Sequence, residues 1–346
     1  AGDCSGGSGP GSCMAAALEV YPTADWGTEY IAPVGVNDGA SGQFGGVAFA
    51  IMATEDDTKV TVTGLASGTT TSCSAGDLNN LDQSQSCIVT NPNRGAKVTT
   101  AAGKPVQVFM LTGIPGSAYE YNGYTLLPRD QWGPSYYSPV GTGNSNPAQI
   151  FAFNPGQGAG GTGALFVRCD YGNNTSTNSA SIAAGTSASF TVPAGYGAHC
   201  YAVTGATGNT PNPDGQFLAI SSVDSGGASW DWGFTLIPDS QLSPQALVGL
   251  GLGQDPTKTL SDNGSPVWVT AACPAGVTTA YIYADINGDG IPDKVDLNGD
   301  RVVSGSPEST SNAGIQVSPL QSIRIFSPDI GGVPQNQTGM RVWTLN

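Results

Sequence analysis

The sequence predicts an all-β protein built from three tandem β-sandwich-like modules, one of which carries an inserted calcium-binding loop. The composition is rich in turn-forming residues, with 50 Gly and 24 Pro in 346 residues. Several short segments alternate apolar and polar residues, whereas sustained helical periodicity is missing. Related segments also recur at a spacing of about 108 residues, which is the size of a β-sandwich domain.

A corner sequence marks the start of each predicted module. GYTLLPRDQWG at 123–133 returns as GFTLIPDSQLS at 233–243, and LEVYPTADWG at 18–27 opens the first copy. The final residues, VWTLN at 342–346, resemble the same closing strand and would be its fourth copy. The predicted organisation is a flexible Cys/Gly/Ser-rich segment at 1–17, followed by modules at 18–128, 129–238 and 239–346.

A second repeated block predicts a half-buried strand in every module. VTTAAGKPVQVF at 98–109, FTVPAGYGAHCY at 190–201 and IQVSPLQSIRIF at 315–326 align without gaps. One face of the strand is apolar, and it comprises Val106, Val108, Ala198, Cys200, Ile323 and Ile325. The other face carries Gln107, His199 and Arg324, which are expected to face solvent.

An oxygen-rich stretch at 285–296, DINGDGIPDKVD, predicts a structural Ca²⁺ site. Strands at 47–53, 164–169 and 280–284 align, so this stretch is an enlarged hairpin loop of the third module. The expected ligands are Asp285, Asn287, Asp289, the Ile291 carbonyl, Asp293 and Asp296, with Gly290 at the sharp turn. Asp replaces the usual Glu at the last position, which shortens the reach of that ligand. The alternative is an acidic, solvated turn.

A second, incomplete metal site is predicted directly after the first. Asn298, Asp300 and Glu308 supply further oxygen ligands next to Asp296. Extracellular calcium at millimolar concentration would order such loops by relieving repulsion between their carboxylates.

Seven cysteines predict an oxidising compartment. Cys169 and Cys200 lie on adjacent predicted strands and are expected to form a disulfide. The other expected pairs are Cys73 with Cys87 and Cys4 with Cys13. Cys273 is then left over, and an alternative pairs it with Cys4 or Cys13. The first residues resemble a mature N-terminus from which a signal peptide has been removed, so secretion or display at the cell surface is expected.

Charge and chemistry exclude several classes of function. The net charge is −15, and the eleven Lys and Arg are scattered, which argues against nucleic acid and anionic membranes as partners. The sequence contains no run of about 18 apolar residues, which is the length that a membrane-spanning helix needs. GDCSGGSG at 2–9 resembles a serine-protease motif, but a Cys interrupts it and the single histidine is His199. A glycosidase needs two carboxylates that flank a cleft, and the sequence marks out no such pair. The formal candidates are Glu29, Glu55, Asp56, Asp57 and Glu120.

Trp230 and Trp232 are the predicted ligand-stacking residues, because they alternate with Asp231 on one strand. We expect Trp26, Trp132 and Trp343 to lie in the core instead.

Three segments resemble the N-terminal β domain of IgGFc-binding proteins and their bacterial secreted relatives. They read VAFAIMATEDDTKVTV at 47–62, GKPVQVF at 103–109 and TLLPRDQWGPSYYSPV at 125–140. The resemblance implies a secreted, β-rich module of adhesive or surface-structural character without enzymatic activity. It carries over no residue-level motif for binding immunoglobulin.

The predicted function is that of a non-enzymatic extracellular structural or adhesive β-repeat protein stabilised by calcium. Self-association head to tail through residues 1–22 would build a surface filament or layer, because a spare strand beside an open sheet edge favours strand addition. The alternative is a secreted carbohydrate- or protein-binding module, and a glycoside hydrolase is third. The modules are expected to form either a row or a closed pseudo-threefold ring.

Overall fold

A computed structural model shows antiparallel sheets and no α-helix among the residues it describes, which confirms the all-β part of the predicted fold class. It describes residues 19–39, 43–71, 81–114, 121–142, 147–156, 163–223, 232–249, 266–273, 276–299, 314–326, 329–330, 333–334 and 337–344. The helices in these ranges are short 3₁₀ turns, η1 (Thr23–Asp25), η2 (Val36–Asp38), η3 (Arg129–Gln131) and η4 (Asp239–Gln241). Within the described part of the chain, none is long and apolar enough to cross a membrane.

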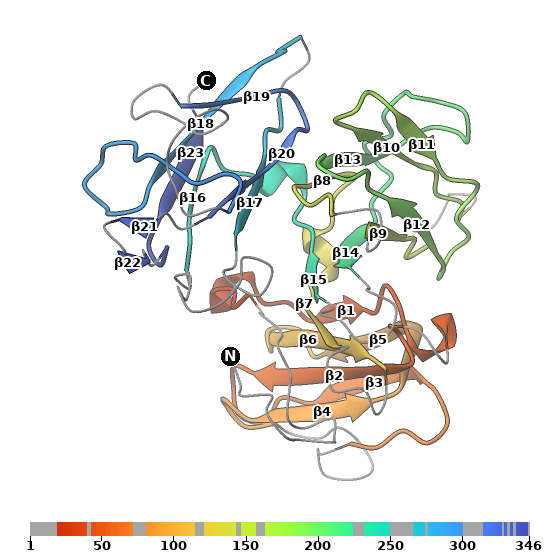
Figure 1. The fold of residues 1–346 in the computed structure, drawn as a ribbon. Coiled ribbons are helices and arrows are strands. Elements are labelled where there is room, and N and C mark those ends of the chain that lie inside the picture. The colour runs from red at the N-terminus through yellow and green to blue at the C-terminus, as the bar shows by residue number, and fades with distance from the viewer. Residues whose placement is uncertain are drawn as a thin grey trace.

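The N-terminal group of strands, β1–β7, forms two sheets at the bottom of Figure 1. Their strand orders are β1-β5-β3 and β4-β2-β6-β7. The strands are β1 (Glu29–Ile31), β2 (Gly46–Ala53), β3 (Val60–Leu65), β4 (Ser86–Thr90), β5 (Pro92–Thr100), β6 (Val106–Gly113) and β7 (Tyr121–Thr125).

The middle group, β8–β15, repeats this arrangement with one more strand. Its sheets have the orders β8-β13-β10-β11 and β12-β9-β14-β15. The strands are β8 (Ser135–Ser138), β9 (Ala148–Phe153), β10 (Val167–Tyr171), β11 (Ser176–Asn178), β12 (Ser187–Thr191), β13 (Ala198–Ala202), β14 (Leu218–Val223) and β15 (Trp232–Thr235).

The C-terminal group, β16–β23, lies beside the middle group in Figure 1. Its sheets have the orders β16-β23-β18-β19, β17-β20 and β21-β22. The strands are β16 (Gln245–Leu247), β17 (Val267–Thr270), β18 (Ala280–Asp285), β19 (Ile315–Val317), β20 (Ser322–Ile325), β21 (Asp329–Ile330), β22 (Val333–Pro334) and β23 (Arg341–Thr344).

Strand order corrects two predictions of the repeat alignment. β23 lies between β16 and β18, as β13 lies between β8 and β10, so the final strand is not a copy of the closing strands β7 and β15. The aligned segments 98–109 and 190–201 form β5–β6 and β12–β13, which occupy different places in their sheets. The alignment failed because every half-buried strand has the same period-2 pattern.

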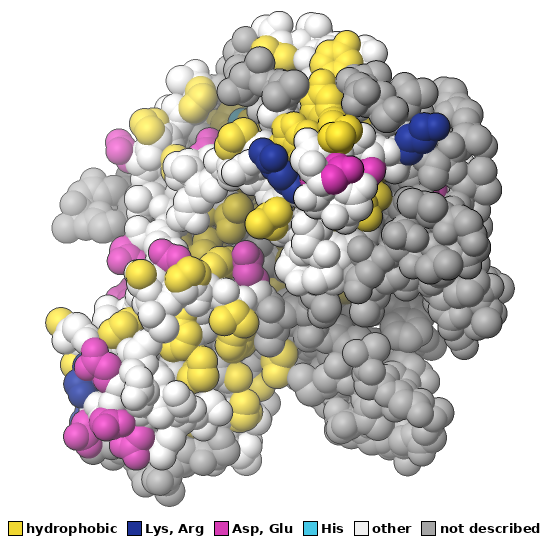
Figure 2. All heavy atoms as spheres, turned by 90° about the vertical axis from the view of Figure 1, so that its left-hand side faces the viewer, with side chains coloured by type: hydrophobic (Ala, Val, Ile, Leu, Met, Phe, Trp, Pro, Cys, Tyr) yellow, Lys and Arg dark blue, Asp and Glu magenta, His cyan; other side chains and the backbone are white. Residues whose placement is uncertain are grey.

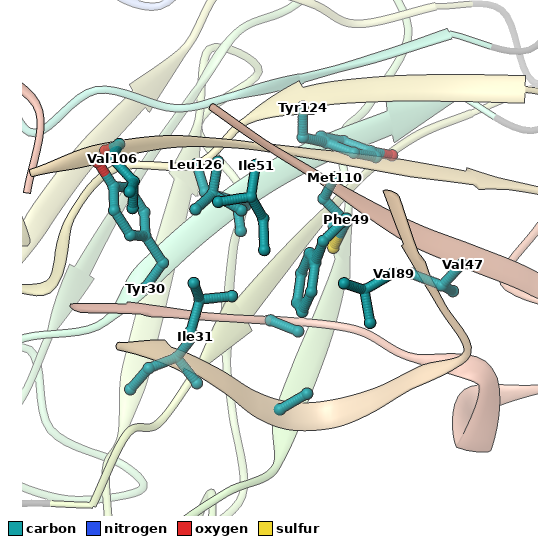
Figure 3. Close-up of a cluster of buried hydrophobic side chains, with 14 of the residues drawn as sticks. Tyr30, Ile31, Val47, Phe49, Ile51, Val89, Val106, Met110, Tyr124 and Leu126 are labelled. Atoms are coloured by element: carbon teal, nitrogen blue, oxygen red, sulfur yellow. Dashed lines mark hydrogen bonds between the residues drawn. The ribbon is translucent and has the colours of Figure 1, made fainter. Parts of the chain in front are cut away.

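The corner sequences fold identically at the start of the first two groups. The backbone N–H of Gly27 donates to the Tyr30 hydroxyl (2.8 Å), which donates to the Val106 carbonyl (2.6 Å). Figure 3 shows this hydroxyl beside Val106. Tyr136 makes the same pair of bonds with the Gly133 N–H (3.0 Å) and the Phe217 carbonyl. Each tyrosine thereby joins a corner to a strand of the opposite sheet.

The buried residues form three hydrophobic clusters, and the first one crosses between groups. Phe153, Leu218 and Ile220 of the middle group are part of the N-terminal core. The predicted apolar face is confirmed, since Val106, Val108, Ala198, Cys200, Ile323 and Ile325 are all buried. The expectation that Gln107 faces solvent is wrong, because only 1% of it is exposed.

We predict that Tyr136→Phe lowers the free energy of unfolding by about 1–3 kcal/mol, because it leaves a buried N–H and a buried carbonyl without their partner. Urea unfolding followed by fluorescence measures this change. Tyr201→Phe is the control, since its hydroxyl bonds to a half-buried surface carboxylate and its loss should cost less. Equal losses in both variants would contradict a special role for the corner tyrosine.

Candidate functional site

The outer face of the β8-β13-β10-β11 sheet carries a row of aromatic rings. His199 on β13 lies between Tyr137 on β8 and Tyr201, two residues along β13. The Tyr137 and His199 rings are stacked with centroids 4.1 Å apart, and the His199 and Tyr201 centroids are 4.8 Å apart. All three side chains are half-buried, so the row is partly accessible. His199 lies on the outer face as predicted, but neighbouring rings cover part of its side chain.

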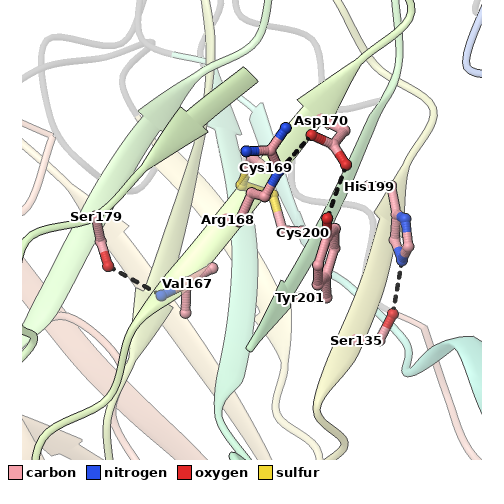
Figure 4. Close-up of a disulfide and its surroundings, with 9 residues drawn as sticks. All are labelled: Ser135, Val167, Arg168, Cys169, Asp170, Ser179, His199, Cys200 and Tyr201. Atoms are coloured by element: carbon pink, nitrogen blue, oxygen red, sulfur yellow. Dashed lines mark hydrogen bonds and ion pairs between the residues drawn. A yellow bond between two sulfur atoms is a disulfide. The ribbon is translucent and has the colours of Figure 1, made fainter. Parts of the chain in front are cut away.

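Charged groups fix one end of this aromatic row. The Arg168 Nε donates to the Asp170 carboxylate (2.7 Å), and the Tyr201 hydroxyl donates to its other oxygen (3.0 Å). Figure 4 shows both bonds beside the His199 ring. Tyr201 is therefore held in one orientation before any ligand arrives.

A serine and a histidine meet on the same face without forming a catalytic triad. The Ser135 Oγ lies 2.8 Å from His199 Nε2. Asp170 is opposite His199 in the strand register, but its carboxylate is bonded to Arg168 and Tyr201. Burial lowers the pKa of His199, whereas Asp170 and Asp239 oppose this shift. The GDCSGGSG motif at 2–9 lies outside the described residues.

Two of the formal glycosidase candidates have ordinary surface partners in the part that the structure describes. Glu29 pairs with Lys97 at 3.2 Å, and the Asp56 carboxylate accepts the backbone N–H of Gln83 at 2.9 Å. Glu120 lies outside the described residues. These contacts provide no positive sign of hydrolytic chemistry.

A hairpin tip of the C-terminal group docks on glycines of the middle group. The backbone N–H of Gly197 donates to the Leu320 carbonyl (2.7 Å), and a Cβ at Gly172 would lie only 2.2 Å from that oxygen. Leu320 itself has a φ of 57°. This close approach of two backbones requires glycine and fixes the junction.

A groove of about 560 Å³ opens beside this junction. Residues from both groups line it, including Gly141, Gly195, Trp268, Gln316, Gln321 and Arg324. The Arg324 guanidinium lies 5.6 Å from the centre of the Trp268 ring, within cation–π range. The groove therefore combines an aromatic wall with a cation and two amides.

Trp232, a predicted ligand-stacking residue, lies next to Trp268. Its ring is half-buried and lies 5.9 Å from Phe234 and 6.3 Å from Trp268. Trp230 lies outside the described residues, so stacking of a ligand by this pair stays a prediction. The sequence did not point to Trp268 with Arg324, because only the β17–β20 pairing makes them cross-strand neighbours.

The predicted calcium loop follows β18 and is held by carboxylates that accept backbone N–H groups. Asp285, 3% exposed, accepts from Gly288 (2.6 Å) and Gly290 (2.9 Å), and Asp293 accepts from Ile286 (2.7 Å). Asn287 and Asp289 accept from residues two positions further on, and the Ile291 side chain is exposed. Gly288 and Gly290 have positive φ, so the turn requires their freedom.

Asp296 begins the predicted second site and is fully buried. Its carboxylate accepts the N–H groups of Asn298 (3.0 Å) and Gly299 (2.6 Å). Asp300 and Glu308 lie outside the described residues. Within the described ranges, no group of three or more His, Cys, Asp or Glu converges as a metal site. Calcium binding therefore stays a prediction of the sequence.

The Cys169–Cys200 disulfide is confirmed and lies directly beneath the aromatic row (Figure 4). Both cysteines are buried on the inner face of their paired strands. Cys87 is also disulfide-bonded, while Cys4, Cys13 and Cys73 lie outside the described residues. Cys273 is a free thiol, and burial raises its pKa.

Comparison with known proteins gives one family. The family model described as IgGFc binding protein matches residues 15–241, which include the N-terminal and middle groups of strands. No curated protein and no solved structure matches the chain.

We predict that the stability lost on acidification is smaller in His199→Gln than in the natural chain. The folded-state pKa of His199 is lowered by burial. The contribution of neutral His199 to the free energy of unfolding is therefore complete when the pH is above the unfolded-state pKa of about 6.5. It is lost as the pH falls below that value. Urea unfolding at pH 7.5 and 5.5 measures the difference, and NMR titration of the single histidine checks the pKa directly. Identical pH dependence in both chains would contradict this.

Proposed function

Because the chain belongs to the IgGFc-binding protein family, we propose that it acts outside the cell as a binding or adhesive module for a protein partner. The family is extracellular, and a confirmed disulfide suits that compartment. We propose no enzymatic activity, since the described acid opposite His199 in the strand register, Asp170, bonds to Arg168 and Tyr201 and does not orient the imidazole.

The aromatic row on the middle group carries this proposal. Tyr137, His199 and Tyr201 present flat, partly accessible rings on β8 and β13, and a disulfide joins β13 to the neighbouring β10. Aromatic side chains with few freely rotating bonds are enriched where proteins bind each other. The Asp170–Arg168 pair places charged groups at one end of the aromatic row, and these would orient a partner on it.

The finer architecture that we propose is three copies of one β-sandwich module, with boundaries at 18–128, 129–238 and 239–346. Two pairs of sheets with matching strand order support it.

We also propose Ca²⁺ at the loop from Asp285 to Asp296, and self-association into a filament or layer at the cell surface. The face drawn in Figure 2 shows few Lys and Arg side chains, which suits a protein without polyanionic partners.

A small-ligand site is the second candidate function, and the groove with Trp268 and Arg324 favours it. An aromatic wall beside amides and a guanidinium is the lining that carbohydrates use, through stacking and hydrogen bonds. A glycan array separates this candidate from protein binding, and Trp268→Ala should abolish any signal that depends on the groove.

We predict that Tyr201→Ala weakens partner binding about tenfold, because it removes an oriented aromatic contact. Purified IgG Fc is the first probe, followed by an array of extracellular proteins, with affinity measured by surface plasmon resonance. Tyr281→Ala is the matched control, since Tyr281 is 43% exposed on the C-terminal group. Failure of the natural chain to bind any protein probe would contradict the proposed function.

We predict that millimolar Ca²⁺ raises the melting temperature by several degrees, about 1–3 kcal/mol through preferential binding to the folded state. EDTA should reverse the shift, and Asp289→Ala should remove most of it by deleting one ligand. Asp82→Ala, in an exposed turn of the N-terminal group, should keep the full shift. A melting temperature indifferent to both Ca²⁺ and EDTA would exclude the calcium site.

A further inference from the structure

The sheet β16-β23-β18-β19 of the C-terminal group can be compared residue by residue with the sheet that carries the aromatic row. Its strand order matches β8-β13-β10-β11. Ala284 on β18 is opposite Val342 on β23, and both are buried, as Cys169 on β10 and its opposite residue Cys200 on β13 are. Residues next to these four along each strand therefore point to the outer face in both sheets.

This register places a second row of side chains on the outer face of the C-terminal sheet. Arg341 precedes the buried residue of β23 and takes the position of His199, while Trp343 follows it and takes the position of Tyr201. Leu247 on β16 is opposite Arg341, in the place of the first ring of the aromatic row. We call Leu247, Arg341 and Trp343 the C-terminal row.

The C-terminal row combines a cation, an aromatic ring and an aliphatic side chain. The Arg341 guanidinium lies 4.8 Å from the centre of the Trp343 ring, and this ring stacks on Tyr283 with centroids 5.6 Å apart. Arg341 is exposed, and Leu247 is 73% exposed. Both of them line a hollow of about 550 Å³ beside β16. The row is therefore accessible and borders a concave surface.

One diagonal side-chain contact recurs on the outer face of all three groups. The contacts join Lys97 to Glu29 (3.2 Å), His199 to Ser135 (2.8 Å) and Arg341 to Gln245 (2.8 Å). In the N-terminal group the contact is an ion pair, so the cation is neutralised by its neighbour. Gln245 is uncharged, so the same contact in the C-terminal group leaves the charge of Arg341 available.

The acid of the aromatic row is also turned away from the C-terminal row. Asp170 bonds to the aromatic row, but Asp285, at the same position in the register, is only 3% exposed. Its carboxylate accepts two backbone N–H groups of the loop that follows β18. Arg341 is opposite Asp285 and packs on Trp343 instead. In a chain with a net charge of −15, this exposed cation favours a partner that carries carboxylates.

We propose that the C-terminal row is a second binding surface, and that its partner is an acidic segment of a protein. This inference extends the proposed binding function from the middle group to the C-terminal group. A carboxylate of the segment pairs with the Arg341 guanidinium, and an apolar side chain beside it packs on Leu247 in the hollow. A peptide carries both kinds of group, whereas an acidic saccharide has no aliphatic side chain for Leu247.

The first test is surface plasmon resonance with a copolymer of Glu and Tyr at low ionic strength, where charge pairs are least screened. Arg341→Gln should weaken binding about tenfold, because it removes the cation and its charge-assisted hydrogen bonds. Lys59→Gln removes the same charge from an exposed residue of the N-terminal group and should bind as the natural chain does. A natural chain that does not bind the copolymer, or equal binding by both variants, would overturn the proposal.

Gln245→Glu tests the charge without altering Arg341. This variant recreates the ion pair of Lys97 with Glu29 at the equivalent position, so it should weaken binding of the copolymer as much as Arg341→Gln does. Gln83→Glu adds the same charge in an exposed turn of the N-terminal group and should bind normally. Full binding by Gln245→Glu would show that the charge of Arg341 is not what the partner recognises.

Further arms separate this surface from the alternatives. Polygalacturonate is an acidic saccharide, and binding of it that is tighter than binding of the copolymer would overturn the choice of a protein partner. Tyr201→Ala in the middle group, and Tyr281→Ala on the β19 side of the C-terminal sheet, should both leave copolymer binding unchanged. Loss of copolymer binding in Tyr201→Ala would contradict a separate surface. Failure of the Tyr201 prediction with the copolymer results intact would count against the aromatic row alone.

Discussion

The strand β14 is buried along its whole length, and the arrangement of the first two groups depends on this burial. Its sheet packs against β8-β13-β10-β11 on one face and against the N-terminal core on the other. Two buried serines lie on β14, and a buried hydroxyl without a partner is costly; among the described residues the Ser221 hydroxyl has none, whereas Ser222 needs partners from the facing group. Ser222 finds them by donating to Gln43 and accepting from Asn122 across the junction. Register and contact between groups are thereby specified together.

Because the sheet that contains β14 is covered on both faces, the other sheet of the middle group, β8-β13-β10-β11, is the one whose outer face can contact a partner. The inner face of β8-β13-β10-β11 carries the Cys169–Cys200 disulfide and the core, so its alternate residues point outward. Tyr137, His199 and Tyr201 are presented from paired strands rather than from loops. A site on such a scaffold loses little conformational entropy when a partner binds.

The sequence predicted the features that depend on the local residue pattern, and it missed those that depend on which strands pair in a sheet. The repeated corner identified equivalent turns because a proline and a 3₁₀ turn recur at fixed spacing, with a glycine after the turn in the first two copies. The Cys169–Cys200 pair followed from two alternating segments. The alternation itself could not say which sheet a strand joins, so β6 and β13 were wrongly equated. Gln107 shows the same limit, because a strand covered on both faces buries its polar residue as well.

The C-terminal group has no counterpart of β14 among the described residues, and its predicted calcium loop and the hollow beside β16 lie at one strand pair. β23 connects the two regions, because Asp285 at the end of β18 is opposite Arg341, and Arg341 also lines the hollow beside β16. An ion that orders the loop after Asp285 would therefore stabilise the β18–β23 pair. This pair belongs to one small hydrophobic cluster, which also includes residues from β17, β19 and β20. Since coupling between binding and folding is reciprocal, an ion in this loop and the folded C-terminal group would stabilise each other to the same degree.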